Sequence, residues 1–223
     1  MLMDIESFSL VDYPGHIAAT IFFGGCNFRC GYCQNPILVK VEEKSRTSPS
    51  DVIDFLKTRK GLLDGVCFTG GEPLMSPDLP PLVLAIKGLG YKIKLDTNGS
   101  QLEKLREIAS NLDYIAIDIK ADPEKYDRLT GCKNSWERVN QTIEWVKKSG
   151  IFYEFRTTVM PFWHTFEDLT KIRVLLGKET PWVLQQFRQP PQGVLDGKPY
   201  ESYPDSWLKE AGQKLNCQVR GLH

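Results

Sequence analysis

The sequence has no excess of charge of either sign, because 28 lysine and arginine residues balance 28 aspartate and glutamate residues. A chain without net charge creates no global field that would draw it to nucleic acid or to an anionic membrane. It also lacks an apolar run long enough to cross a bilayer, and Met1-Leu2-Met3-Asp4 does not begin a signal peptide. We therefore expect no nucleic-acid partner, no membrane partner and a cytoplasmic location.

The sequence also lacks a fixed-period repeat and a low-complexity segment, and its 223 residues suffice for one substantial core. We expect a single domain over residues 1–223. Apolar segments predict strands at residues 17–23, 66–68, 91–96, 114–119, 151–159 and 182–187. Amphipathic segments predict helices at residues 48–59, 79–89, 101–110, 136–148, 166–176 and 205–215.

This alternation predicts an α/β fold with a parallel sheet and right-handed crossovers. A closed eight-stranded barrel needs roughly 250 residues, so six βα units favour a partial (β/α)6 TIM-like barrel. Three segments are less regular. We interpret residues 39–47 as a loop or short β excursion, and residues 217–220 as a short strand or extended tail. Residues 189–203, rich in proline and glycine, form a long loop that is a candidate for closing over the site.

Three of the six cysteines, Cys26, Cys30 and Cys33, follow the first predicted strand with C-x₃-C-x₂-C spacing. This motif lacks a fourth ligand, whereas structural zinc sites and [4Fe–4S] clusters normally use four, so one metal position stays open. The alternatives are a zinc knuckle completed by His16 or a distant cysteine, and three ordinary buried thiols. Neither explains the glycines around the motif, which let backbone wrap closely around an inorganic core.

The other cysteines, Cys67, Cys132 and Cys217, lie far apart without ligand spacing, and we interpret them as small core or half-buried residues. Reducing conditions in the cytoplasm would keep Cys26, Cys30 and Cys33 free to bind metal. No second cluster is expected.

Polar residues recur where the predicted strands end, which is where barrel enzymes build their active sites. The candidates are Gly70, Gly71 and Glu72, then Asp96 and Asn98, Asp118 and Lys120, Arg156, His164, and Gln185. Each has a structural alternative. The glycine pair and the Asp96–Asn98 stretch also suit strand-ending turns. Asp118 and Lys120 also suit a salt bridge, and Arg156 a pair with Glu154 or Asp118.

His164 alone indicates little, because a single loop histidine is usually solvated. Gln185 could frame an adenine edge, although an apolar strand explains its neighbour Phe187 almost as well. Phe28 and Tyr32 are placed to shield the sulfurs of the cysteine motif from water.

The cysteine spacing resembles that of the radical S-adenosylmethionine (SAM) superfamily. The flanking sequences Leu10-Val11-Asp12-Tyr13-Pro14-Gly15, Gly25-Cys26-Asn27-Phe28-Arg29-Cys30 and Gln34-Asn35-Pro36 resemble those of glycyl-radical-enzyme activases. Among them, the activases of anaerobic ribonucleoside-triphosphate reductase are the most similar. The resemblance covers almost the whole chain and implies the partial barrel of the radical SAM type.

The resemblance implies a [4Fe–4S] cluster on the three cysteines, which act as both metal ligands and catalytic residues, with SAM bound beside it. It assigns the amino group of SAM to the glycine motif, its carboxylate to Lys120, and positioning to Asp118. It further implies reductive cleavage of SAM to a 5′-deoxyadenosyl radical, which removes hydrogen from a glycine of the partner enzyme. A flavodoxin or ferredoxin-type protein would supply the electron.

Three other functions stay open at this stage. The chain could activate a pyruvate formate-lyase-like enzyme, or act on a small molecule, as the radical SAM deazapurine synthases do. It could also be a non-catalytic iron–sulfur or zinc module.

Overall fold

The computed structural model describes residues 2–40 and 47–222, which form one curved sheet of eight strands joined in chain order. All neighbouring pairs from β2 to β8 are parallel, and only β1 runs antiparallel to its neighbour β2. The strands are β1 (Leu2–Ser9), β2 (Ala18–Phe23), β3 (Gly65–Gly70), β4 (Lys92–Thr97), β5 (Tyr114–Asp118), β6 (Phe152–Val159), β7 (Trp182–Gln186) and β8 (Gln218–Arg220). The six predicted strands correspond to β2 through β7, so the expected α/β fold is confirmed.

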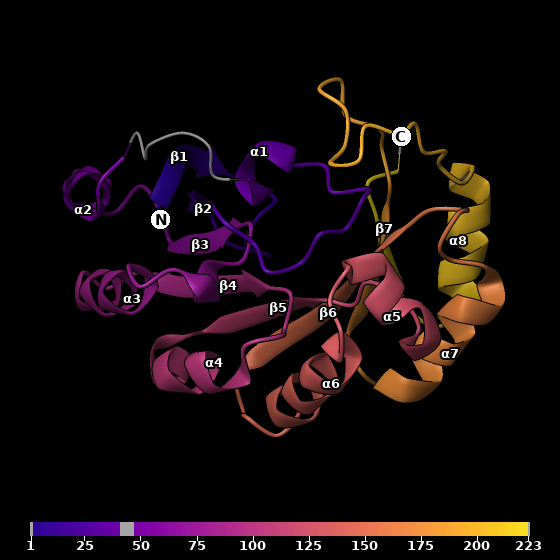
Figure 1. The fold of residues 1–223 in the computed structure, drawn as a ribbon. Coiled ribbons are helices and arrows are strands. Elements are labelled where there is room, and N and C mark those ends of the chain that lie inside the picture. The colour runs from indigo at the N-terminus through magenta and orange to yellow at the C-terminus, as the bar shows by residue number, and fades with distance from the viewer. Residues whose placement is uncertain (1, 41–46, 223) are drawn as a thin grey trace.

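The helices lie on the outer, convex side of this sheet, as Figure 1 shows for α2, α3, α4, α6, α7 and α8. The helical segments are α1 (Pro36–Val39), α2 (Pro49–Lys57), η1 (Pro73–Met75), α3 (Leu79–Gly88), α4 (Leu102–Ile108), η2 (Ala109–Asn111), α5 (Pro123–Thr130), α6 (Ser135–Val146), α7 (Phe166–Leu176) and α8 (Asp205–Lys214). Within the part of the chain that the structure describes, no helix is both long and apolar enough to cross a membrane.

Burial on both faces explains why the parallel strands are apolar throughout. Four of six residues of β3 and five of six of β2 are buried, as expected for strands covered by helices outside and by side chains within. The edges of the sheet are β1 and β8, so among the described residues the barrel does not close. Figure 1 shows β1 at the left and β7, the neighbour of β8, to the right of the centre.

Two helices begin with the capping pattern that their sequences encode. Ser48 and Asp51 form a capping box at α2, and Thr165 and Asp168 form one at α7. Beyond the end of α3, Gly90 has φ +92, where glycine avoids the strain that other residues incur.

Three elements were absent from the sequence prediction. Strand β1 is a polar edge strand, α1 has four residues, and α5 buries only Tyr126, Leu129 and Thr130. Neither β1 nor α1 has an apolar pattern long enough to reveal it, whereas Asp122, Pro123 and Gly131 mark the ends of α5. Residues 41–46 of the predicted 39–47 loop lie outside the described residues, and Val39 ends α1.

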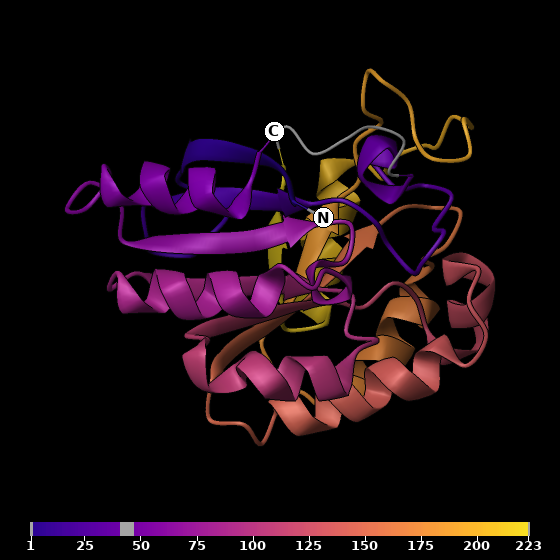
Figure 2. The ribbon, with the colours of Figure 1, turned by 60° about the vertical axis from the view of Figure 1, so that its left-hand side comes forward.

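The long loop after β7 packs against the cysteine segment, and none of residues 189–203 lines the pocket. The backbone N–H of Leu195 donates to the carbonyl of Cys33 (3.2 Å), and that of Asp196 donates to the carbonyl of Gly31 (3.0 Å). The Tyr200 hydroxyl donates to the Asp196 carboxylate (2.7 Å). That the loop closes over the site stays a prediction, since these contacts tie it to the cysteine segment but none of its residues lines the pocket. In Figure 2 it stands at the upper right, beside α1.

Candidate active site

The cysteine segment crosses the carboxyl ends of the strands, between β2 and α1. Its base is held where the N–H of Gly25 donates to the carbonyl of Leu38 (2.7 Å), and its far end where the N–H of Arg29 donates to the carbonyl of Thr130 (2.7 Å). Cys30 is buried, and Cys26 and Cys33 are half-buried. All three are free thiols that line one pocket, so the loop brings the three predicted ligands together.

Burial suppresses ionisation of the Cys26 and Cys30 thiols when nothing else binds them. Desolvation raises the pKa of Cys30 to about 12 and that of Cys26 above its ordinary value, although Lys120 opposes both shifts. A bound cation reverses this preference, because thiolates are the form that ligates metal.

The glycine motif locks the cysteine segment onto β3 through close backbone contacts. A Cβ on Gly71 would lie 2.1 Å from the carbonyl oxygen of Gly25, and one on Gly70 would lie 2.3 Å from that of Phe23. The N–H of Gly71 donates to Phe23, and the N–H of Glu72 to Gly25, both at 2.8 Å. Both glycines also line the pocket.

Glu72 lies behind the pocket wall, fully buried, and is not among the lining residues. Its carboxylate accepts hydrogen bonds from the Thr97 hydroxyl (2.7 Å) and from the N–H groups of Asn98 (2.7 Å) and Leu74 (3.2 Å). Burial raises its pKa to about 7 despite these donors. The side chain therefore joins the turn after β3 to the turn after β4.

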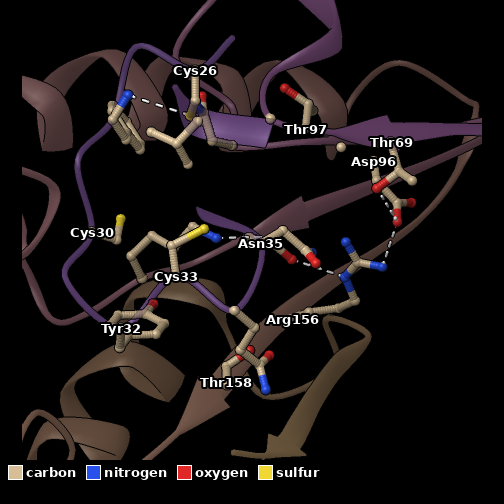
Figure 3. A pocket seen from close by; sticks show the side chains of 18 of the residues that line it. Cys26, Cys30, Tyr32, Cys33, Asn35, Thr69, Asp96, Thr97, Arg156 and Thr158 are labelled. Atoms are coloured by element: carbon tan, nitrogen blue, oxygen red, sulfur yellow. Dashed lines mark hydrogen bonds and ion pairs between the residues drawn. The ribbon is translucent and has the colours of Figure 1, made fainter. Parts of the chain in front are cut away.

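A chain of five charged side chains runs along the inside of the sheet across β4, β5 and β6. Arg156 is its centre, with Nη1 2.9 Å from Asp96 and Nε 2.9 Å from Asp118. Lys94 contacts Asp96, and Lys120 lies 3.0 Å from Asp118. Three cations and two anions leave one positive charge in excess. In Figure 3 Asp96 and Arg156 lie across the pocket from the cysteines.

The pKa shifts of Asp118 and Lys120 favour the charged form of both side chains. Burial alone would raise the pKa of Asp118, but Arg156 and Lys120 hold it well below the ordinary value. Burial alone would lower the pKa of Lys120, but Asp118 and neighbouring Tyr32 and Cys30 keep it above the ordinary value. Arg156 and Lys120 each form an ion pair with Asp118, and all three residues also line the pocket. A structural role and a role in ligand binding are therefore compatible for these residues.

Other predicted residues complete the lining. Asn98 donates from Nδ2 to Asn27 Oδ1 (2.9 Å) and lies 3.9 Å from Cys26 Sγ. The pocket is also lined by Gln185, on β7, and by Tyr32, whose ring meets Phe187 edge-on at 6.4 Å.

His164 does not reach the pocket and is not solvated, since it is fully buried behind Lys120. Its Nε2 lies 2.9 Å from the carbonyl of Lys120, and its Nδ1 accepts from the N–H of Met160 (3.4 Å). Desolvation lowers its pKa to about 4, so the ring is neutral and donates from Nε2. It supports the backbone that carries Lys120.

The donor set fits an iron–sulfur cluster better than a single metal ion. Among residues 2–40 and 47–222, no three Cys, His, Asp or Glu side chains converge closely enough to hold one metal ion. In a four-iron cube each cysteine binds a different iron, which suits three separated thiols of soft character.

His16 is excluded as a fourth ligand because it precedes β2 whereas the cysteines follow it, and six strand residues span about 20 Å. There it contacts Lys92 and the carbonyl of Pro14. Cys67 is fully buried in β3, and Cys132 and Cys217 are half-buried. None of these four residues lines the pocket.

Of the predicted site residues, all but Glu72 and His164 line one pocket. Sequence reasoning missed Gln34, Asn35 and Thr69 as lining residues. Thr69 could have been found from its place before the glycine pair, and Gln34 and Asn35 from directly following the third cysteine.

Comparison with known proteins agrees with this geometry. A family model described as the radical SAM superfamily matches residues 20–172. MJ1227 of Methanocaldococcus jannaschii, whose name gives it a proposed role as a glycyl-radical enzyme activating enzyme, is 32% identical over 226 residues. That alignment covers 97% of this chain and 88% of MJ1227.

A pyruvate formate-lyase-activating enzyme of Clostridium pasteurianum is 35% identical over 133 residues, covering 57% of this chain and 56% of that enzyme. This chain therefore spans little more than half the length of that relative. The crystal structure of Streptococcus suis SuiB bound to S-adenosylmethionine superimposes with a TM-score of 0.73 at 15% identity. The superposition covers 92% of this chain and 52% of SuiB, and supports the fold. The chain belongs to the radical SAM superfamily, whose members use a [4Fe–4S] cluster and S-adenosylmethionine, and within it to the glycyl-radical-enzyme activating enzymes.

Proposed function

We propose that this chain installs a glycyl radical on anaerobic ribonucleoside-triphosphate reductase. The observation that carries the activating chemistry is the pocket itself, where three cysteine thiols face a chain of charged side chains. The choice of reductase is supported by the sequences flanking the cysteines, above all Leu10–Gly15 and Gln34–Pro36.

Cys26, Cys30 and Cys33 would hold the cluster, leaving one iron for substrate. The cluster and SAM, when bound, supply the one-electron cleavage that yields methionine and the 5′-deoxyadenosyl radical. The protein contributes position and charge. Lys120, with the excess positive charge of the chain of charged side chains, favours the carboxylate of SAM at the β5 end. The backbone of Gly70 and Gly71 lines the place for its amino group.

The remaining polar lining residues orient the ligand and limit water. Asp96 and Arg156 are fixed by their ion pair, and Asn98 by its hydrogen bond to Asn27, before ligand arrives, so little ordering cost remains on binding. Gln185 offers an amide to the adenine edge, and Tyr32 shields the cysteine side of the pocket. His164 and Glu72 act indirectly by holding Lys120 and Asn98 in place.

The test is anaerobic reconstitution with iron and sulfide, dithionite reduction with SAM, and assay of 5′-deoxyadenosine. Cys30→Ala should abolish the product and the SAM-perturbed cluster EPR signal, whereas Cys132→Ala, outside the pocket, should retain both. Co-incubation with the reductase should then give a glycyl radical EPR doublet. A chain that binds only zinc and forms no deoxyadenosine would disprove the activity.

A pyruvate formate-lyase-like partner is the second candidate, favoured by the similarity to the Clostridium enzyme. Offering both partner enzymes in the same reaction separates the two. The doublet should appear on the reductase; its appearance only on the lyase would refute our choice of partner.

A further inference from the structure

Four basic side chains surround the outer side of the cysteine segment, and we call them the basic face: Arg29, Arg128, Lys133 and Arg138. Arg29 belongs to the cysteine segment, Arg128 to the last turn of α5, and the others to the start of α6 and the turn before it. The N–H of Arg29 donates to the last residue of α5, Thr130, which joins these elements. Figures 1 and 2 both show α5 beside the cysteine segment.

None of the four forms an ion pair with a carboxylate within residues 2–40 and 47–222. Arg29 donates to the carbonyl of Phe28 (2.8 Å), and Arg138 contacts Cys132 Sγ (2.8 Å). The nearby carboxylate of Asp127 instead accepts from the N–H groups of Asn134 and Ser135, at 2.7 and 2.8 Å.

Such unpaired cations are notable in a chain whose charges balance overall. Helices α5 and α6 carry four acidic residues, of which Glu124 pairs with Lys171 and Glu144 with Lys147, so that Asp127 and Glu137 remain near the four cations. The local balance is therefore four cations against two anions.

The basic face is separated from the pocket by one thickness of backbone. Cys26, Phe28 and Cys30 line the pocket, whereas Arg29, between the last two, is exposed. The exposed side chain of Arg29 is therefore adjacent in sequence to Phe28, which faces the pocket. Only the cysteine segment separates the basic face from the three thiols. This short distance favours electron transfer, whose rate falls steeply with distance.

An apolar centre adjoins the charges. The Arg128 guanidinium lies over the Trp163 ring at 5.4 Å, and the neighbouring Phe162 ring is 65% exposed. Charged residues around a small exposed aromatic group suit a transient protein contact, in which charge speeds encounter and the interface stays small.

We propose that the basic face, with Phe162, is the docking surface for a small acidic electron carrier of the flavodoxin or ferredoxin type. This inference rests on the proposed function, which requires one electron from outside for each cleavage. The carrier would lose one electron, and the cluster held by Cys26, Cys30 and Cys33 would accept it. Docking outside the cysteine wall leaves the pocket mouth to the glycyl radical enzyme.

The experiment measures binding of purified oxidised flavodoxin, and separately of ferredoxin, to the reconstituted chain by calorimetry at 50 to 300 mM salt. The double variant Arg128→Glu/Lys133→Glu should weaken binding about tenfold and flatten the salt dependence. The matched control Lys60→Glu/Lys148→Glu carries the same change in net charge on exposed residues at the other end of the strands. It should bind the carrier as wild type does.

A second readout separates this inference from the function it rests on. Deoxyadenosine formed with dithionite should be equal in wild type and both double variants, whereas carrier-driven formation should fall only in the Arg128/Lys133 variant. Equal carrier affinity in the two double variants would overturn the docking surface, whatever the activity. Loss of dithionite-driven product in all proteins would count against the function instead, with the binding data still deciding the surface.

Discussion

Substitution of Gly71 by alanine tests whether the glycine motif acts by close backbone approach. The added Cβ would lie 2.1 Å from the carbonyl oxygen of Gly25, 2.7 Å from its carbonyl carbon and 2.9 Å from the carbonyl oxygen of Leu38. These are backbone atoms that cannot rotate away. The base of the cysteine segment must move by about 1 Å to restore ordinary contact.

The cost can be worked from the contacts that this movement breaks. Overpacking costs about 1–3 kcal/mol, and losing a hydrogen bond such as that from Glu72 to Gly25 adds about 1 kcal/mol. A total near 3 kcal/mol lowers the melting temperature of a chain this size by roughly 6–12 °C. Since Gly25 directly precedes Cys26, we also expect iron content after reconstitution to fall below half of the wild-type value.

The assay is thermal unfolding of the metal-free chain, followed by iron analysis of the reconstituted protein. Gly88→Ala is the matched control, because a Cβ at that helical position meets nothing within 4 Å. It should raise stability by about 0.5–1 kcal/mol, as alanine replaces glycine in a helix. A Gly71→Ala protein with wild-type melting temperature and iron content would refute the close-approach argument.

Three further predictions concern the polar residues. Arg156→Lys keeps the charge but cannot bridge Asp96 and Asp118 together, so SAM affinity measured by calorimetry should fall about tenfold; unchanged affinity would contradict this. Glu72 has a folded pKa of about 7 against 4.5 when free, so stability falls as pH rises from 4.5 to 7, by up to about 3 kcal/mol. In Glu72→Gln the free energy of unfolding in urea should no longer fall between pH 4.5 and 7. A dependence on pH that remains would show that another group causes it. Burial lowers the pKa of His164 to about 4, so its contribution to the free energy of unfolding is full above pH 6.5 and is lost as the pH falls toward 4. The NMR resonance of its ring should therefore not titrate between pH 7.5 and 5.5.

The sequence predicted the six parallel strands because their signal is local and strong. Strand β5, for example, reads as an apolar run ending in Asp118, and helices flank it on both sides along the chain. Order along the chain also equals order in the sheet, so the convergence of strand ends followed without any long-range information. That is why most of the pocket could be predicted.

What could not be predicted depends on the direction of side chains across separate elements. Glu72 and His164 come from the correct loops but point into the protein, toward Asn98 and Lys120. Their partners are 26 and 44 residues away, and no periodicity encodes such pairings. Helix α5 is different, because local signals mark it: Asp122 and Pro123 begin it and Gly131 ends it, so it could have been predicted from the sequence.

The contact between the cysteine segment and the loop after β7 sets an order of events during synthesis. The carbonyl of Cys33 is bonded by Leu195, which is 162 residues later in the chain (195 minus 33). At about 5–20 residues per second, the ribosome needs roughly 8–32 s to reach that partner. Until Leu195 has left the ribosome, the three thiols lack this support. Oxygen or stray zinc would find them most accessible then, so damage to this protein should track its rate of translation as well as the oxygen level of the cell.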